Sequence, residues 1–189
     1  MSARPSIRLS HAGFHVFDLD RMVDFFTTVY GLEVTDRGSI EGRGEIAFLG
    51  ADPRDHHQLV LYQGRTARDG VHHNHVSFEV GDLDRLREIH RALRGWPGVT
   101  NLLTVNHGVA WSVYCDDPEG NRTEVFVDTP WHVDQPYYSG DLDLSLSDAE
   151  IAERTGRMLE SDPTTEPVGQ WRERFAERLG IGGTAPEEG

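Results

Sequence analysis

Apolar and polar residues follow one another along the chain in an order that occurs twice. In the stretch "HAGFHVFDLDR", from His11 to Arg21, alternating apolar positions predict a short strand, and the following aspartate predicts the cap of a helix. The stretch "HVSFEVGDLDR", from His75 to Arg85, has the same order and ends in the same four residues. Apolar residues at helical spacing follow each cap, namely Met22, Phe25, Phe26 and Val29 in the first copy and Leu86, Ile89 and Leu93 in the second.

Each helical pattern is followed by a stop signal and by further strand patterns. Gly31 and Gly95 are expected to end the two helices. Later strands are predicted by "EIAFLG" and "HQLVLYQG" in the first copy, and by "VAWSVYC" and "TEVFVD" in the second. The last strands align as "DPRDHHQLVLY" with "DPEGNRTEVFV". The pattern therefore predicts two βαβββ modules, at about residues 7–65 and 71–128.

Two such modules predict an α+β fold. A half-sheet cannot bury its inner face alone, so the two modules should pair into a curved, open, barrel-like β-sheet that encloses a cleft, with the helices outside. Residues 1–130 would form this domain, and residues 131–189 would form a C-terminal extension.

The extension contains two helical patterns. "SLSDAEIAERTGRMLE" begins with a capping box of Ser147 and Glu150. "GQWRERFAERLG" predicts a helix that packs on the domain or on a partner through Trp171, Phe175 and Leu179. The proline-broken segment around Trp131 resembles neither a strand nor a helix and is expected to lie across the mouth of the cleft. The residues after Gly180 are expected to be disordered.

Charge and composition narrow the class of partner. The chain has 189 residues, with 32 acidic residues against 18 basic ones, and its net charge is −14. Such a surface repels phosphates, so nucleic acid and anionic membranes are not expected as partners. No apolar run has the length of a membrane span, no secretory signal is visible, and the single Cys115 cannot form an internal disulfide. A reducing cytoplasm is therefore the expected location.

The repeated motifs resemble a known superfamily. A histidine that begins a strand, the "DLDR" cap and the closing "DPEGNRTEVF" resemble the vicinal oxygen chelate superfamily, which includes glyoxalase I, antibiotic-resistance proteins and type I extradiol dioxygenases. The resemblance covers about residues 7–130. It implies a metal ion between the modules, bound by residues of the first and last strands of each. The corresponding positions are His11, His75, Glu124 and Leu59.

The fourth of these positions changes the ligand count. Leucine cannot bind a metal, so two imidazoles and one carboxylate remain, which is the set that holds Fe(II) while leaving coordination positions open. Mn(II) prefers similar ligands and is the alternative ion. A single strand histidine is more often a hydrogen-bonded structural residue, but two histidines at equivalent positions of a repeat favour ligands. His72 and His73 precede the strand and are expected to be loop residues.

Two residues are candidates for acid–base and hydrogen-bonding roles. His57 lies two residues before Leu59 and should share its face of the strand, and "HHQLVLY" resembles the stretch that carries the catalytic histidine of extradiol dioxygenases. Tyr114 has the spacing to Glu124 of that family's catalytic tyrosine, whose phenol would donate a hydrogen bond to a substrate oxygen. The alternatives are a polar histidine at a strand edge and an ordinary tyrosine of an amphipathic strand. His56 should point the other way and be exposed.

Three further residues have weaker signals. His107 resembles a substrate-binding histidine of the dioxygenases. His15 lies on the same strand face as His11 and is expected to line the cleft or to hydrogen-bond a carboxylate. Cys115 has no visible base beside it and is expected to face away from the cleft.

The favoured prediction is an extradiol, ring-cleaving dioxygenase that uses Fe(II) and O2 on a catechol-type aromatic diol. One alternative is another metal-dependent enzyme of the superfamily, such as a glyoxalase-like isomerase or a thiol transferase. The other is a non-catalytic, ligand-binding resistance protein. Paired-module proteins of this size often dimerise, which makes a homo-oligomer one possibility, and the sequence leaves the oligomeric state open.

Overall fold

The computed structural model describes residues 9–40, 44–66, 75–135 and 142–180. The first module contains β1 (Ala12–Val16), α1 (Leu19–Tyr30), β2 (Glu33–Ile40), β3 (Gly44–Gly50) and β4 (Leu59–Gln63). The second contains β5 (Val76–Glu79), α2 (Leu83–Gly95), β6 (Thr100–Asn106), β7 (Ala110–Asp116) and β8 (Arg122–Asp128). The predicted order βαβββ is therefore confirmed in both modules.

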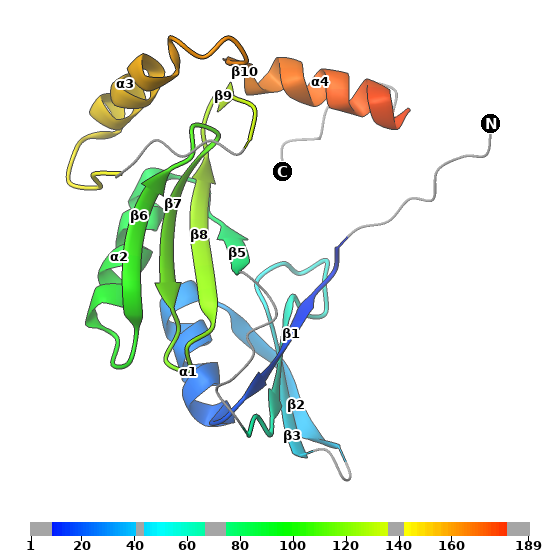
Figure 1. Cartoon of the computed structure of the whole chain (residues 1–189). Helices are drawn as coiled ribbons and strands as arrows, with labels where there is room; N and C mark the ends of the chain where they lie inside the picture. Colours follow the sequence, from blue (N-terminus) through cyan, green and yellow to red (C-terminus); the bar gives the residue numbers. More distant parts are fainter. Residues whose placement is uncertain (1–8, 41–43, 67–74, 136–141, 181–189) are drawn as a thin grey trace.

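The strands of these described ranges form two four-stranded sheets, with the orders β1-β4-β3-β2 and β5-β8-β7-β6 (Figure 1). In each sheet the first strand of the module runs parallel to the last, and the other neighbours are antiparallel. The α+β class is confirmed. The described strands of the two modules form two separate open sheets, and they close into no barrel.

The helix caps follow the repeated motif. Asp18 and Asp82 each accept a hydrogen bond from a backbone N–H three residues later, which satisfies a donor that the first helical turn leaves open. Gly31 ends α1 in the left-handed conformation, with a φ of 69°. Gly95 does not end α2 in this way, because it is still helical and the cap is Trp96 in an extended conformation, whose N–H donates to Leu93.

Both helices bury the faces that the sequence predicts. α1 packs on β3 and β4 of its own sheet, α2 packs on β7 and β8, and the two helices also contact each other. The predicted apolar positions of both helices are buried, and they join the strand side chains in one hydrophobic core. Burial of each large apolar side chain contributes about 1.5–3 kcal/mol. The shared core therefore accounts for much of the association between the modules.

A loop of the second module also closes onto the first module. Glu119 is buried, and its carboxylate accepts hydrogen bonds from the backbone N–H of Phe17, at 2.9 and 2.7 Å, and of Asp18, at 2.8 Å. Buried Asp117 shapes the same loop by accepting bonds from the N–H groups of Glu119 and Asn121. The turn between β7 and β8 thus binds the junction between β1 and α1.

The extension is partly helical, as predicted. It contains β9 (Trp131–His132), α3 (Asp148–Leu159), β10 (Glu166–Pro167) and α4 (Val168–Leu179), and β9 pairs with β10. β9 is a short strand where the sequence predicted none. The capping box of Ser147 and Glu150 is present at the start of α3. Figure 1 shows α3, α4 and the β9–β10 pair beyond one end of the second sheet.

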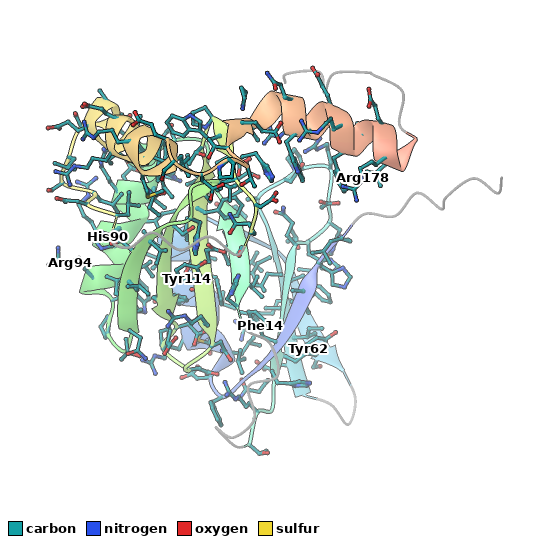
Figure 2. All side chains as sticks on the ribbon, turned by 45° about the horizontal axis from the view of Figure 1, so that its top comes forward. Phe14, Tyr62, His90, Arg94, Tyr114 and Arg178 are labelled. Atoms are coloured by element: carbon teal, nitrogen blue, oxygen red, sulfur yellow. The ribbon has the colours of Figure 1, made fainter. Side chains whose placement is uncertain are left out.

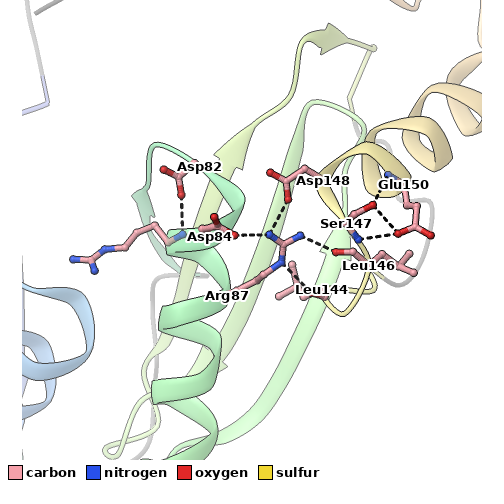
Figure 3. A network of polar contacts seen from close by, with 9 residues as sticks. Asp82, Asp84, Arg87, Leu144, Leu146, Ser147, Asp148 and Glu150 are labelled. Atoms are coloured by element: carbon pink, nitrogen blue, oxygen red, sulfur yellow. Dashed lines mark hydrogen bonds and ion pairs between the residues drawn. The ribbon is translucent and has the colours of Figure 1, made fainter.

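Polar contacts fix the start of α3 against α2. Arg87 of α2 forms ion pairs with Asp84 and Asp148 and donates to the carbonyl oxygens of Leu144 and Leu146 (Figure 3). At the other side, Thr155 of α3 accepts hydrogen bonds from Asn106 and Trp111 of the second sheet. α3 is therefore part of the packed domain.

α4 packs less closely. Trp171 stacks on His132 with ring centroids 4.7 Å apart, while Phe175 remains 39% exposed. Trp131 packs against the hydrophobic core at its edge. None of the helices in the described ranges combines the length and the apolar character that crossing a membrane requires. The predicted disorder after Gly180 lies outside the described residues.

Candidate functional site

Glu124 is the centre of a polar cluster in the second module. β8 lies between β5 and β7, so Ser77 and Tyr114 are the register partners of Glu124 on its two sides. The carboxylate accepts a hydrogen bond from Ser77 Oγ, and its Oε2 lies 3.3 Å from His75 Nε2. The structure therefore brings together two of the three expected ligands, His75 and Glu124.

The surroundings of Glu124 keep its carboxylate ionised. Burial alone would raise the pKa of Glu124, but hydrogen bonds from Ser77 and Tyr114 lower the pKa overall, with help from Ser112 and His75. Ser112 is fully buried, and its hydroxyl forms no well-formed hydrogen bond with the described residues. An anionic carboxylate beside an imidazole is a suitable pair of donors for a divalent cation.

Tyr114 and His107 extend this cluster. The Tyr114 hydroxyl lies 3.0 Å from His107 Nε2, and Figure 2 shows Tyr114 on the second sheet. Burial, followed by the hydrogen bond with Glu124, raises the pKa of Tyr114 well above its usual value. The phenol therefore stays protonated near neutral pH and can donate a hydrogen bond.

Three histidines of the first module, His11, His56 and His57, form a second cluster. The rings of His11 and His57 have centroids 4.5 Å apart, and His57 Nδ1 lies 2.8 Å from His56 Nδ1. His56 Nε2 in turn lies 2.8 Å from Asp36 Oδ2. Burial and then the neighbouring His11 and His56 lower the pKa of His57. His56 is exposed, as expected, but its ring contacts His57.

The predicted alignment of Leu59 with Glu124 is wrong by one residue. Leu59 faces α1 and belongs to the hydrophobic core, whereas Glu124 lies on the face of its sheet away from α2. Val60 pairs with Gly13 as Glu124 pairs with Ser77, and it occupies the equivalent position. Valine is no more a ligand than leucine, so the count of three expected ligands is unchanged.

The reason for the error is where β4 begins. The strand starts at Leu59, so the alternation of faces does not extend back to His57. The ring of His57 instead packs on Phe48, at a centroid distance of 5.0 Å, and Phe48 is the register partner of Val60. His57 therefore lies on the opposite side of the sheet from Leu59.

The two clusters are separate in the structure. Across the described residues, no three His, Cys, Asp or Glu side chains converge closely enough to hold an ion. His11 lines a cavity of about 360 Å³ together with Val76 and Ser77, so it lies at the boundary between the modules. The donor set of His11, His75 and Glu124 fits Fe(II) or Mn(II) by its chemistry. His75 and Glu124 already lie side by side.

His15 lies apart from both clusters, and His72 and His73 lie outside the described residues. The ring of His15 lies 5.5 Å from that of Tyr62 and makes no described contact with Glu124. Cys115 is buried against Tyr30 and Thr123, and burial raises the pKa of its thiol, in agreement with the expected orientation away from the site.

A pocket of about 480 Å³ opens beside Glu124. Apolar side chains form part of its wall, and polar side chains converge on it from several strands and from the extension. Its lining residues are Ser77, His107, Val109, Ala110, Tyr114, Glu124, Phe126, Asp128 and Gln135. An apolar wall with a few convergent polar groups is the usual form of a site for a small organic molecule.

Sequence reasoning named three of the nine residues of this pocket, His107, Tyr114 and Glu124, and among those that it missed Ser77 and Gln135 differ in how visible they were. Ser77 had a usable signal, because it lies two residues after His75 and so shares its face of β5. Gln135 had none, because it lies in the proline-broken segment, where no period predicts the direction of a side chain.

The chain matches the model of a protein family and is similar to several known proteins. The profile of the Glyoxalase/Bleomycin resistance protein/Dioxygenase superfamily matches residues 8–125. A biphenyl-2,3-diol 1,2-dioxygenase of Rhodococcus globerulus is 29% identical over 137 residues, which are 68% of this chain and 65% of the relative. A lactoylglutathione lyase of Arabidopsis thaliana is 28% identical over 155 residues, 77% of this chain and 54% of the relative. The chain thus aligns with less than two thirds of each of these relatives.

Solved structures agree on the fold. A glyoxalase/bleomycin resistance protein/dioxygenase domain from Frankia sp. EAN1pec has a TM-score of 0.56 at 17% identity, covering 66% of this chain and 94% of that domain. A glyoxalase family protein from Bacillus cereus has a TM-score of 0.51 at 20% identity, covering 68% of this chain and 98% of that protein. At these identities the likeness supports the fold and leaves the reaction open.

Proposed function

The chain belongs to the Glyoxalase/Bleomycin resistance protein/Dioxygenase superfamily, and from this membership we propose that it is an Fe(II)-dependent extradiol dioxygenase. Its substrates would be a catechol-type aromatic diol and O2. The observation that carries the proposal is the contact of His75 with Glu124, flanked by Tyr114 and His107 at the edge of one pocket.

Each residue has a distinct role in this proposal. His11, His75 and Glu124 would hold the ion, for which Mn(II) is the alternative. Bound there, Fe(II) would supply the redox chemistry between an aromatic diol and dioxygen. Tyr114 would donate a hydrogen bond to a substrate oxygen, because its raised pKa keeps the phenol protonated.

Two histidines would assist, His107 in the pocket and His57 in the first module. His107 holds the Tyr114 hydroxyl through its Nε2 and would orient both groups toward the substrate. His57, beside His11, would hold and move a proton, because an imidazole changes charge near neutral pH. The apolar residues Val109, Ala110 and Phe126 would bind the ring and exclude water.

A metal-dependent isomerase is the second candidate, because a plant lactoylglutathione lyase also matches over 77% of the chain. A site with four protein ligands is disfavoured here. The position equivalent to Glu124 in the first module is Val60, which cannot bind an ion.

An oxygen electrode separates the two candidates. The protein is loaded anaerobically with Fe(II) and then mixed in air with monocyclic and bicyclic catechols. We expect oxygen uptake together with a yellow ring-opened product. The Glu124→Gln variant is the matched control and should show neither. Absence of uptake with every diol, together with turnover of the hemithioacetal of methylglyoxal and glutathione, would replace the proposal by the isomerase.

A further inference from the structure

The C-terminal extension contributes directly to the pocket beside Glu124. The family profile matches residues 8–125, and Asp128 and Gln135, which lie beyond that match, both line the pocket. This part of the wall is therefore supplied by chain outside the region that defines the family. Side chains in such a position can distinguish substrates without altering the metal ligands.

The extension also holds the turn that carries His107. Gln135 Nε2 donates to the carbonyl oxygen of His107 at 3.2 Å, and Thr129 Oγ1 donates to that of Gly108. The N–H of Thr129 donates to Val109 at 2.9 Å. Three consecutive residues of the turn, two of them lining the pocket, are thus fixed by Gln135 of the extension and by Thr129, which follows β8.

Gln135 is itself held in place. Its Nε2 also lies 3.3 Å from the carbonyl oxygen of Val133, whose side chain is fully buried. The N–H of Asp134 donates to Thr164 Oγ1 at 3.0 Å, which fixes this segment against the connection between α3 and β10. A residue fixed in this way can present a polar group to a ligand at little cost in side-chain entropy.

We propose that Gln135 is a specificity-determining residue that favours diols with a hydrogen-bond-donating ring substituent, such as a hydroxyalkyl or aminoalkyl group. The inference rests on the proposed function. Gln135 and Asp128 both line the pocket, and each side chain carries an oxygen that can accept a hydrogen bond; the Gln135 amide nitrogen already donates to backbone carbonyls. Arg172 lies 2.6 Å from the Asp128 carboxylate and balances its charge, whereas the chain as a whole carries a net charge of −14. Substrates with a carboxylate substituent should therefore be disfavoured.

The test compares three catechols that share one ring and differ in the 4-substituent. They carry a 2-aminoethyl, an ethyl and a carboxymethyl group, and kcat/KM is measured with the iron-loaded protein. We expect wild type to prefer the aminoethyl compound over the other two. Gln135→Leu should reduce the ratio of aminoethyl to ethyl turnover by about tenfold, as expected for loss of a hydrogen bond to the substrate. Gln135→Glu should raise this ratio.

Two controls make the outcome decisive. Gln170→Leu changes the same residue type on α4, outside the pocket lining, and should leave the ratio unchanged. Iron content should be equal in all variants. Turnover of catechols by Gln135→Leu at an unchanged ratio would overturn the inference and leave the proposed function intact. Absence of turnover of every catechol by wild type would overturn both.

Discussion

Glu124 and His57 differ in their surroundings, so their contributions to iron binding and to turnover should be separable. Glu124 lies beside His75 and is the carboxylate of the proposed ligand set, whereas His57 contacts His11 from the side. Glu124→Gln should reduce Fe(II) affinity by more than the roughly 10–100-fold that loss of an outer partner costs. His57→Gln should retain the ion and slow turnover by roughly 10²–10⁴-fold.

A ferrous chelator and single-turnover rates measure these two effects. His90→Gln, on α2 and outside the pocket beside Glu124, is the control and should match wild type in both measurements. Loss of iron from His57→Gln as complete as that from Glu124→Gln would contradict the assignment of separate roles.

At the residue scale, the repeat predicted that His75 and Glu124 lie close together, although their role as ligands stays a prediction, and it did not predict every register. The prediction worked because the first and last strands of each module are neighbours in one sheet. It failed at Leu59, because a shift of one residue moves a side chain to the other face of a strand. The sequence around residues 51–58 does not reveal where β4 begins.

At the scale of elements, the turn between β7 and β8 makes a testable contribution to stability. Glu119→Ala would leave the N–H groups of Phe17 and Asp18 without their acceptor in a partly buried place. We expect a loss of about 2–4 kcal/mol in the free energy of unfolding, seen as a lower urea midpoint. Glu153→Ala removes an exposed i,i+4 ion pair with Arg157 and should change the free energy by no more than about 0.5 kcal/mol. Equal midpoints for the two variants would show that the Glu119 contacts contribute nothing.

The extension should be sensitive to acid. Hydrogen bonds lower the pKa values of Asp143, Glu150, Asp162 and Glu166. A carboxyl group with a lowered pKa in the folded state contributes stability above its unfolded pKa and loses it as the pH falls through the folded value. The contribution should therefore fade below about pH 4.5, the usual value for glutamate.

Hydrogen exchange between pH 6 and pH 3, corrected for the intrinsic pH dependence of exchange, measures this effect. Amides of α3 should lose protection before those of α1, and Glu150→Gln should reduce the difference. Protection of α3 and α1 that falls together would show that the extension has no acid sensitivity of its own.

The element order was also predictable, because period and caps agree in each module. The packing of α4 was less so. Its apolar spacing predicted a contact face of Trp171, Phe175 and Leu179, but none of the three is buried, and Trp171 stacks on His132 of a two-residue strand that no pattern reveals.

For the whole molecule, the open question is whether the ion joins the two modules. His11 belongs to the first and His75 with Glu124 to the second, and all three are expected ligands. Mn(II) at 100 times its Kd should stabilise the protein by about 2.7 kcal/mol and raise its Tm. His11→Ala and His75→Ala should each remove most of this shift, whereas His15→Ala should keep it. A full shift in His11→Ala would mean that the second module holds the ion by itself.

The contact of Glu119 with Phe17 also has a consequence for the time course of synthesis. The two residues are separated by 102 positions in the chain, so the acceptor for the amides just before α1 does not yet exist when those amides leave the ribosome. At about 5–20 residues per second, the delay is on the order of 5–20 s. During this interval the newborn first half has a junction between β1 and α1 without its acceptor, and an uncovered apolar surface. It is then that the polypeptide most needs protection by a chaperone.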